Sequence, residues 1–256
     1  MPAHGHINPM LPLMRELVSR GDEVIVYLTR EFEAVVRATG ASVRLISEAL
    51  ALPTSFVGGG EPALIKMMPL MYNMYARGMS ESPRLAERAR EEGADALVYD
   101  PLALWGRSVA RMLGLPTALF HTTFATASPN LQRNFNKNRQ RLPPLPAMLP
   151  LLRLKWSSWM LEARHGVPRL GLGGAYTLVE DLNLVPVPRS FQPDADYFDE
   201  RYVFMGPSVQ PRGERGDFPL ERLEGKQVLC IALGTSPMNQ QPAFYKACFE
   251  AFRDTP

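Results

Sequence analysis

The chain has 256 residues, and its 28 basic and 26 acidic side chains leave a formal net charge of +2. That balance is typical of a globular protein and excludes a dedicated nucleic-acid binder, because the basic residues gather on no one segment. No apolar run approaches the ~20 residues that a membrane-spanning helix needs, so we expect no integral membrane segment. The two cysteines, Cys230 and Cys248, fall in an expected strand and an expected helix. They predict no disulfide framework and fit a reducing cytoplasm.

Short strands alternate with helices along the first two hundred residues. Strands are expected at 23–29, 42–46, 96–99, 116–121, 182–187 and 202–205, and helices at 9–20, 31–39, 63–79, 83–92 and 104–113, before a Pro-rich, helix-containing stretch that reaches about residue 165. Alternation of this kind predicts an α/β fold with a parallel, doubly wound, Rossmann-like sheet.

The first strand of this sheet is absent from the pattern. The chain opens in the turn before a helix, which Asn8 caps and Gly21 ends. In the common strand order 3-2-1-4-5 the first strand is central, so its absence predicts a gap in the middle of the sheet. We therefore expect a further strand to precede Met1.

The last fifty residues predict a linker and the opening of a second domain. Residues 207–225 are rich in Pro, Gly and charge and separate a domain at 1–206 from a unit at 226–256. That unit reads as a buried strand at 228–233, a turn at Gly234, Thr235 and Ser236, and a helix at 242–252. One strand and one helix cannot bury a core, so we expect this second domain to be incomplete.

One histidine and one aspartate are expected to meet at the carboxyl edge of the sheet. His6 lies between the missing first strand and the first helix, and Asp100 ends the fourth strand, which neighbours the first. A histidine with an unperturbed pKa near ~6.5 can accept a hydroxyl proton, and a carboxylate on its other ring nitrogen orients it and stabilises the imidazolium. The pair is a candidate general base. The alternative is that His6 caps a turn and Asp100 merely ends a strand.

Several stretches resemble the family 1 glycosyltransferases, and in particular the bacterial macrolide glycosyltransferases. They are Ala3-His4-Gly5-His6-Ile7-Asn8-Pro9, the strand Ala94–Asp100, the strand that opens with Leu115-Pro116-Thr117-Ala118, and Ala232-Leu233-Gly234-Thr235-Ser236 followed by Gln241-Pro242-Ala243-Phe244-Tyr245. The resemblance runs along essentially the whole chain. It implies a GT-B fold, in which an N-terminal acceptor domain and a C-terminal donor domain face each other across a cleft.

The resemblance also implies an activity: inverting transfer of a sugar, most often glucose from UDP-glucose, to a hydroxyl of a lipophilic acceptor such as a macrolide. It requires no metal and no cofactor besides the nucleotide sugar. His6, directly after the glycine of the motif, would be the base, Asp100 its partner, and His4 the lesser candidate. The segments with which the family grips the diphosphate, the nucleobase and the sugar have no counterpart in this chain. We therefore expect the 256 residues alone to turn over slowly or not at all.

The substrate-binding residues are expected at two places. The acceptor pocket would be lined by Met67 and Met71 of a Met-rich helix and by Phe120, Thr122 and Phe124 after the fifth strand, since thioethers and aromatic rings suit a large apolar ligand. The turn at Gly234, Thr235 and Ser236 would meet the donor's diphosphate. The alternative for the methionines is a place in the core. His121 follows a strand and is expected to pack rather than react.

Two functions remain open from the sequence: a glycosyltransferase, or a non-catalytic module that holds a lipophilic molecule. A serine hydrolase is excluded because no Gly-x-Ser-x-Gly elbow occurs. A nicotinamide oxidoreductase is disfavoured because the chain lacks the glycine fingerprint of a dinucleotide site.

Overall fold

A computed structural model describes residues 2–51, 61–137, 145–169, 177–209, 219–234 and 241–253. The helices are α1 (His4–Ile7), α2 (Leu11–Ser19), α3 (Glu33–Arg37), α4 (Glu61–Glu91), α5 (Leu104–Leu113), α6 (Pro129–Lys137), α7 (Leu145–His165) and α8 (Pro242–Ala251). The strands are β1 (Ile25–Leu28), β2 (Ser42–Leu45), β3 (Leu97–Tyr99), β4 (Thr117–Phe120), β5 (Leu182–Val185) and β6 (Tyr202–Phe204). None of the described helices is long and apolar enough to cross a membrane.

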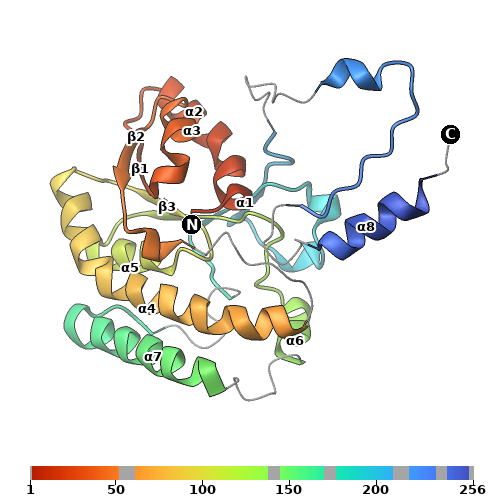
Figure 1. Cartoon of the computed structure of the whole chain (residues 1–256). Coiled ribbons are helices and arrows are strands. Elements are labelled where there is room, and N and C mark those ends of the chain that lie inside the picture. The colour runs from red at the N-terminus through yellow and green to blue at the C-terminus, as the bar shows by residue number, and fades with distance from the viewer. Residues whose placement is uncertain are drawn as a thin grey trace.

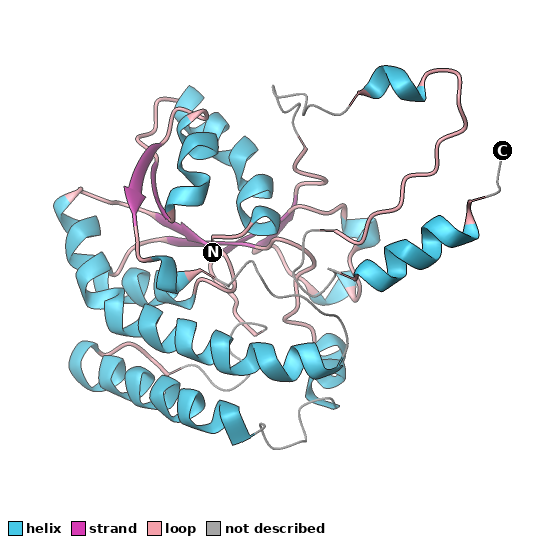
Figure 2. Ribbon diagram, viewed as in Figure 1, coloured by secondary structure: helices cyan, strands magenta, loops and turns pink. Residues whose placement is uncertain are grey.

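The strands form parallel pairs throughout, in two separate pieces. β1 pairs with β2, and β3, β4, β5 and β6 follow one another in a second sheet. Helices α1 to α3 lie on one side of the strands and α4, α5 and α7 on the other (Figures 1 and 2). The α/β architecture is confirmed, and the expected break lies between β1 and β3.

Two of the hydrophobic cores lie beside the two pieces of sheet. The smaller core joins α1 and α2 to β1 and β2 through Ile7, Leu11 and Leu28 among others. The larger core lies between the second sheet and helices α4 and α5, around Tyr99 and Trp105. Tyr27 of β1 packs against the larger core, and Ile46, which follows β2, is buried in it, so this core also bridges the two pieces.

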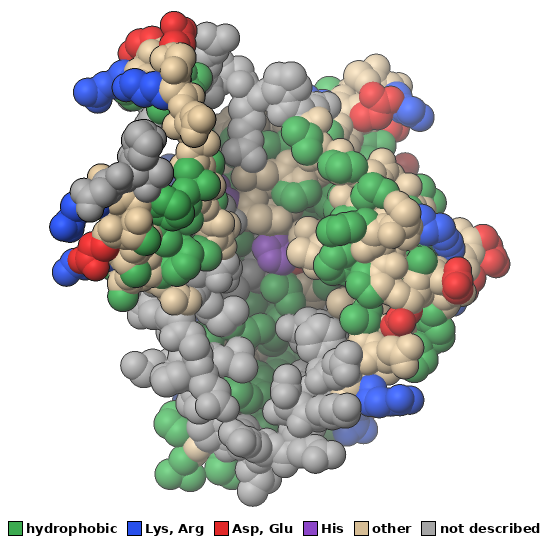
Figure 3. Space-filling model, turned by 90° about the vertical axis from the view of Figure 1, so that its right-hand side faces the viewer, with side chains coloured by type: hydrophobic (Ala, Val, Ile, Leu, Met, Phe, Trp, Pro, Cys, Tyr) green, Lys and Arg blue, Asp and Glu red, His purple; other side chains and the backbone are tan. Residues whose placement is uncertain are grey.

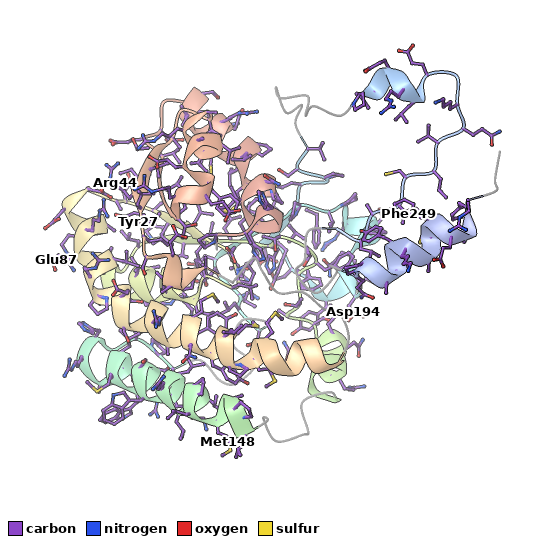
Figure 4. The ribbon with its side chains drawn as sticks, in the orientation of Figure 1. Tyr27, Arg44, Glu87, Met148, Asp194 and Phe249 are labelled. Atoms are coloured by element: carbon purple, nitrogen blue, oxygen red, sulfur yellow. The ribbon has the colours of Figure 1, made fainter. Side chains whose placement is uncertain are left out.

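A charged cluster ties the two pieces together. Glu92, which follows α4, accepts hydrogen bonds from the Tyr27 hydroxyl on β1 and from the Arg44 guanidinium on β2. Figure 4 shows Tyr27 and Arg44 side by side, above the end of α4 that carries Glu87. Since α4 packs in the larger core, this cluster couples the smaller sheet to it.

One helix replaces two that the sequence predicted. Residues 63–79 and 83–92 were expected as separate helices, because Pro83 suits the first turn of a new one. Instead α4 is continuous over 31 residues, with Pro69 and Pro83 inside it. Pro83 has no N–H to donate to the Met79 carbonyl. The long helix is nevertheless retained because it packs along both α5 and α7.

The expected strand at 228–233 is wrong. These residues form no strand, and Val228 and Leu229 are exposed. A strand needs a neighbour to satisfy its backbone groups, and none lies beside this segment among the described residues. The helix expected at 242–252 is confirmed as α8, which buries no side chain and projects outward from the body of the molecule (Figure 1). The Tyr245 hydroxyl of α8 accepts a hydrogen bond from the Leu233 N–H at 3.3 Å.

Candidate active site

Three polar residues stand where strands end, at the carboxyl edge of the sheet. Thr29 follows β1, Asp100 follows β3 and His121 follows β4, and all three are buried. This is the edge at which open α/β sheets bind ligands. On the face shown in Figure 3, a histidine is visible in a hollow between two masses of the molecule.

His6 and Asp100 meet at this edge, as the topology predicts. His6 Nδ1 lies 3.3 Å from Asp100 Oδ1, with 18% of the histidine side chain exposed and none of the aspartate. The contact has ion-pair distance, but its angles are not those of a hydrogen bond. Asp100 Oδ1 also accepts the backbone N–H of Leu102 at 2.8 Å, which holds the carboxylate against the strand end. Because Nδ1 is buried, the exposed part of the imidazole is another portion of the ring.

Burial sets the protonation of His6. It lowers the pKa of His6 from 6.5 to about 4, since the charged form loses its hydration there. The imidazole is therefore neutral at neutral pH, which is the state that can accept a proton. The neighbouring carboxylate would stabilise the imidazolium once it forms.

His4 is engaged elsewhere. Its Nε2 lies 3.3 Å from a Glu31 carboxylate oxygen, and its ring meets the Phe32 ring edge-on at 5.0 Å. Its side chain is largely exposed. His4 is two residues from His6 and therefore lies on the opposite side of α1. Its placement also makes it the lesser candidate for the general base.

A buried clamp that the sequence analysis missed holds the end of β3. The Tyr99 hydroxyl donates to Glu180 Oε1 at 2.6 Å, and the Arg111 guanidinium contacts the other oxygen of Glu180. Burial and the Glu180 contact raise the pKa of Tyr99, so the phenol stays a donor. A Cβ on Gly106 would lie 2.6 Å from Tyr99 Cβ, so α5 approaches β3 closely. The one sequence feature that could have pointed to this clamp is Tyr99, which directly precedes the candidate Asp100.

The expected acceptor residues are spread over different environments. Phe120 is fully buried, whereas Met67, Thr122 and Phe124 are partly buried. Met71 packs against the larger core. The ring of Phe124 lies 5.6 Å from that of Phe191, which is exposed. The structure thus does not gather the five into one enclosed pocket within its described part.

His121 packs, as expected. It is 3% exposed, and its ring lies 6.2 Å from that of Tyr202. Burial lowers the pKa of His121 to about 4.

The expected donor turn is described only in part. Gly234 is exposed and has a φ of +78°, which favours glycine. Thr235 and Ser236 lie outside the described residues. No group of three or more His, Cys, Asp or Glu side chains that could hold a metal occurs among the residues described here.

Comparison with known proteins shows which proteins the chain resembles. No protein-family model matches the chain. It is 31% identical over 264 residues to NDP-glycosyltransferase YjiC of Bacillus subtilis, covering 100% of this chain and 61% of that protein. It is 28% identical to the oleandomycin glycosyltransferase of Streptomyces antibioticus, covering 99% of this chain and 57% of that protein. A Bacillus subtilis protein named as an uncharacterized UDP-glucosyltransferase, YojK, is 28% identical, with 99% and 62% covered.

Solved structures similar to this chain are also glycosyltransferases. The glycosyltransferase of kitacinnamycin superposes with a TM-score of 0.72 at 27% identity, over 100% of this chain and 61% of that one. The calicheamicin glycosyltransferase CalG4 superposes with a TM-score of 0.60 at 28% identity, over 84% and 53%. The chain has the fold of part of a GT-B glycosyltransferase and is similar along its whole length to bacterial glycosyltransferases. It spans about six tenths of the length of the curated relatives it matches.

Proposed function

We propose that this chain supplies the acceptor-binding half of an inverting glycosyltransferase. It would transfer a sugar, glucose from UDP-glucose in the first instance, to a hydroxyl of a lipophilic natural product in the cytoplasm. Residues 1–206 would bind the acceptor, 207–225 would link, and 226–256 would open the donor domain. The observation that carries the proposal is the contact between His6 and Asp100 at the carboxyl edge of the sheet.

The chemistry assigned to the pair is general-base catalysis. The acceptor hydroxyl gives its proton to the neutral His6 imidazole while its oxygen attacks the anomeric carbon of the sugar. The bond from that carbon to the nucleoside diphosphate breaks, and its electron pair leaves with the diphosphate, so the configuration inverts. Asp100 stabilises the imidazolium. No metal is assigned a role; the nucleotide sugar is a substrate.

The names of the relatives support the substrate classes. One relative is named for transfer to oleandomycin and another for transfer from UDP-glucose. Transfer by the present chain to a macrolide, a flavonoid or another polyketide is therefore the proposal to test. The 256 residues alone should turn over slowly, since positioning both substrates can supply ~7–11 kcal/mol and the donor-gripping segments of the family have no counterpart here.

The test is a mass-spectrometric assay with UDP-glucose and a panel of macrolides and flavonoids. It compares the chain with the full product of its reading frame, each as wild type, His6→Ala and His4→Ala. We expect the protein encoded by the full reading frame to form glycosylated acceptor. His6→Ala should lower its activity by about 10²-fold or more, and the matched control His4→Ala should change it little. Activity should hold from neutral pH down to about pH 5 and fall as the pH drops through about 4, where His6 becomes protonated.

Two results would contradict the proposal. Equal losses in the two histidine variants would remove the special role of His6. An absence of product from every protein, together with saturable acceptor binding by calorimetry, would instead support the non-catalytic binding module.

A further inference from the structure

Helix α7 carries an exposed apolar stripe along its outer side. Large apolar side chains recur at intervals of three and four residues, which places them on one face of the helix: Leu145, Met148, Leu149, Leu152, Trp156 and Trp159. Their exposed fractions reach 83% at Leu145, 60% at Leu152 and 63% at Trp156. With ~1.5 Å of rise per residue, the stripe is roughly 20 Å long.

The opposite face of α7 is the one that the protein covers. Ala147, Pro150 and Leu161 are buried, and the helix packs along α4, where Ser157 Oγ lies 3.5 Å from Ser80 Oγ. Figure 4 shows Met148 projecting from the side of α7 that faces away from α4. The stripe therefore points outward, although the helix itself is firmly seated.

Basic side chains flank the stripe on both sides. A helix turns by about 100° per residue, so Arg153 lies to one side of Leu152, and Lys155 lies to the other side of Trp156. Arg164 continues the first flank toward the end of the helix. None of the three makes an ion pair with a described carboxylate. The one acidic residue of α7, Glu162, is paired with Arg169.

The two tryptophans suit a boundary between water and hydrocarbon. Their rings are 5.0 Å apart, and both are exposed on the stripe. An indole has a large apolar body and one N–H donor, so it is stabilised where one side is apolar and the other wet. A helix with an apolar face, tryptophans and flanking Lys and Arg is the pattern that lies in the plane of an anionic bilayer surface.

We propose that the outward face of α7 docks on an anionic lipid bilayer. The stripe would enter the boundary between headgroups and acyl chains, and Arg153, Lys155 and Arg164 would meet lipid phosphates. A second copy of the chain fits this face less well. Two α7 helices packed stripe to stripe would bring their basic flanks together, with no unpaired described carboxylate on α7 to offset them.

The first measurement is sedimentation of the purified chain with vesicles. One set contains phosphatidylglycerol and phosphatidylcholine in equal parts, and the other contains phosphatidylcholine alone. We expect binding to the anionic vesicles that weakens as salt is added. Tryptophan emission should shift to the blue on binding. Of the three tryptophans, Trp105 is already buried, so the shift would report on α7.

Matched variants distinguish membrane binding through the α7 stripe from nonspecific adsorption to the vesicles. Leu152→Glu and Trp156→Glu should each lower binding about tenfold or more, whereas Leu220→Glu should leave it unchanged. Leu220 is 56% exposed, close to the 60% of Leu152, but lies off α7. Replacing Arg153 and Lys155 by Gln should weaken binding to anionic vesicles by about fivefold for each charge removed. Since all these side chains are exposed, the variants should retain the wild-type circular dichroism spectrum and melting curve.

Three outcomes would overturn the proposal. The wild-type chain could remain unbound at low salt. Leu152→Glu and Leu220→Glu could behave alike. Sedimentation velocity without lipid could reveal a dimer that Leu152→Glu dissociates, and then the occupant of the stripe would be a second copy of the chain.

Discussion

Burial of a histidine decides which of its protonation states the folded chain prefers. His6 and His121 both end up with a pKa of about 4, and burial is the largest cause for each. For His6 the consequence concerns its proposed role as a general base. For His121, which is sealed against Tyr202, the consequence concerns stability.

The stability of the fold should therefore depend on pH through His121. The unfolded chain binds a proton at this residue below about pH 6.5, whereas the folded chain does so only below about 4. Stability is thus lost as the pH falls through this window, by about 3 kcal/mol at its lower end. Denaturant unfolding of the wild type and of His121→Gln at several pH values measures it. Between pH 6.5 and 4, the free energy of unfolding of the variant should fall by about 3 kcal/mol less than that of the wild type. If the two plots of unfolding free energy against pH run parallel, His121 is not the residue responsible.

Residue types, together with the expected strand order and the resemblance, pointed to His6 and Asp100. Strand order brings together the residues that follow neighbouring strands. The Tyr99–Glu180 clamp did not follow from the sequence. Glu180 precedes β5 in a loop, and no local pattern says that its carboxylate turns into the protein. Long-range polar contacts of this kind depend on packing, which periodicity does not encode.

At the level of elements, all six strands of the sheet were found within three residues at either end. Each is an apolar run rich in Val, Leu or Ile and bounded by turn residues, so local composition and tertiary burial agree. The expected strand at 228–233 has the same composition but no partner strand, and it does not form. Composition thus predicts a strand only where a sheet is available to receive it.

The close approach of α5 to β3 gives an element-level prediction. Gly106→Ala places a methyl group against Tyr99 Cβ, and neither atom can move without shifting backbone. Alanine is a better helix former by ~1 kcal/mol, but overpacking typically costs ~1–3 kcal/mol. We expect a lower melting temperature and, because Tyr99 precedes Asp100, a further loss of transfer in the full product. A melting temperature above that of the wild type would contradict the close packing.

The exposed stripe of α7 illustrates the limit of hydrophobic periodicity. Apolar residues surround much of this helix, so the pattern does not tell which of them face the protein. Only the contact with α4 identifies the outward set.

Across the whole molecule, buried side chains are distributed unevenly along the chain. The two cores hold residues of the first two hundred positions, whereas residues 219–234 and 241–253 bury no large side chain. One strand and one helix were expected there from the sequence, and of these the helix, α8, is formed.

Hydrogen exchange should reproduce that division. Amides of α8 and of 226–234 should exchange nearly as fast as those of an unstructured peptide, because their opening exposes almost no buried apolar surface. Amides of β4 and β5, which lie inside the second sheet, should exchange only with global unfolding. Mass spectrometry of peptic fragments measures both in one sample. Equal protection in the two regions would mean that the C-terminal unit has a core of its own.

The contact between His6 and Asp100 joins distant parts of the fold. His6 lies beside Ile7 of the smaller core, and Asp100 follows Tyr99 of the larger one. Their 3.3 Å separation therefore depends on how β1 and β2 are held against α4. The hydrogen bonds from Tyr27 and Arg44 to Glu92 contribute to that packing. A substitution at Glu92 would thus reach the proposed base indirectly, through the spacing of two side chains that it does not contact.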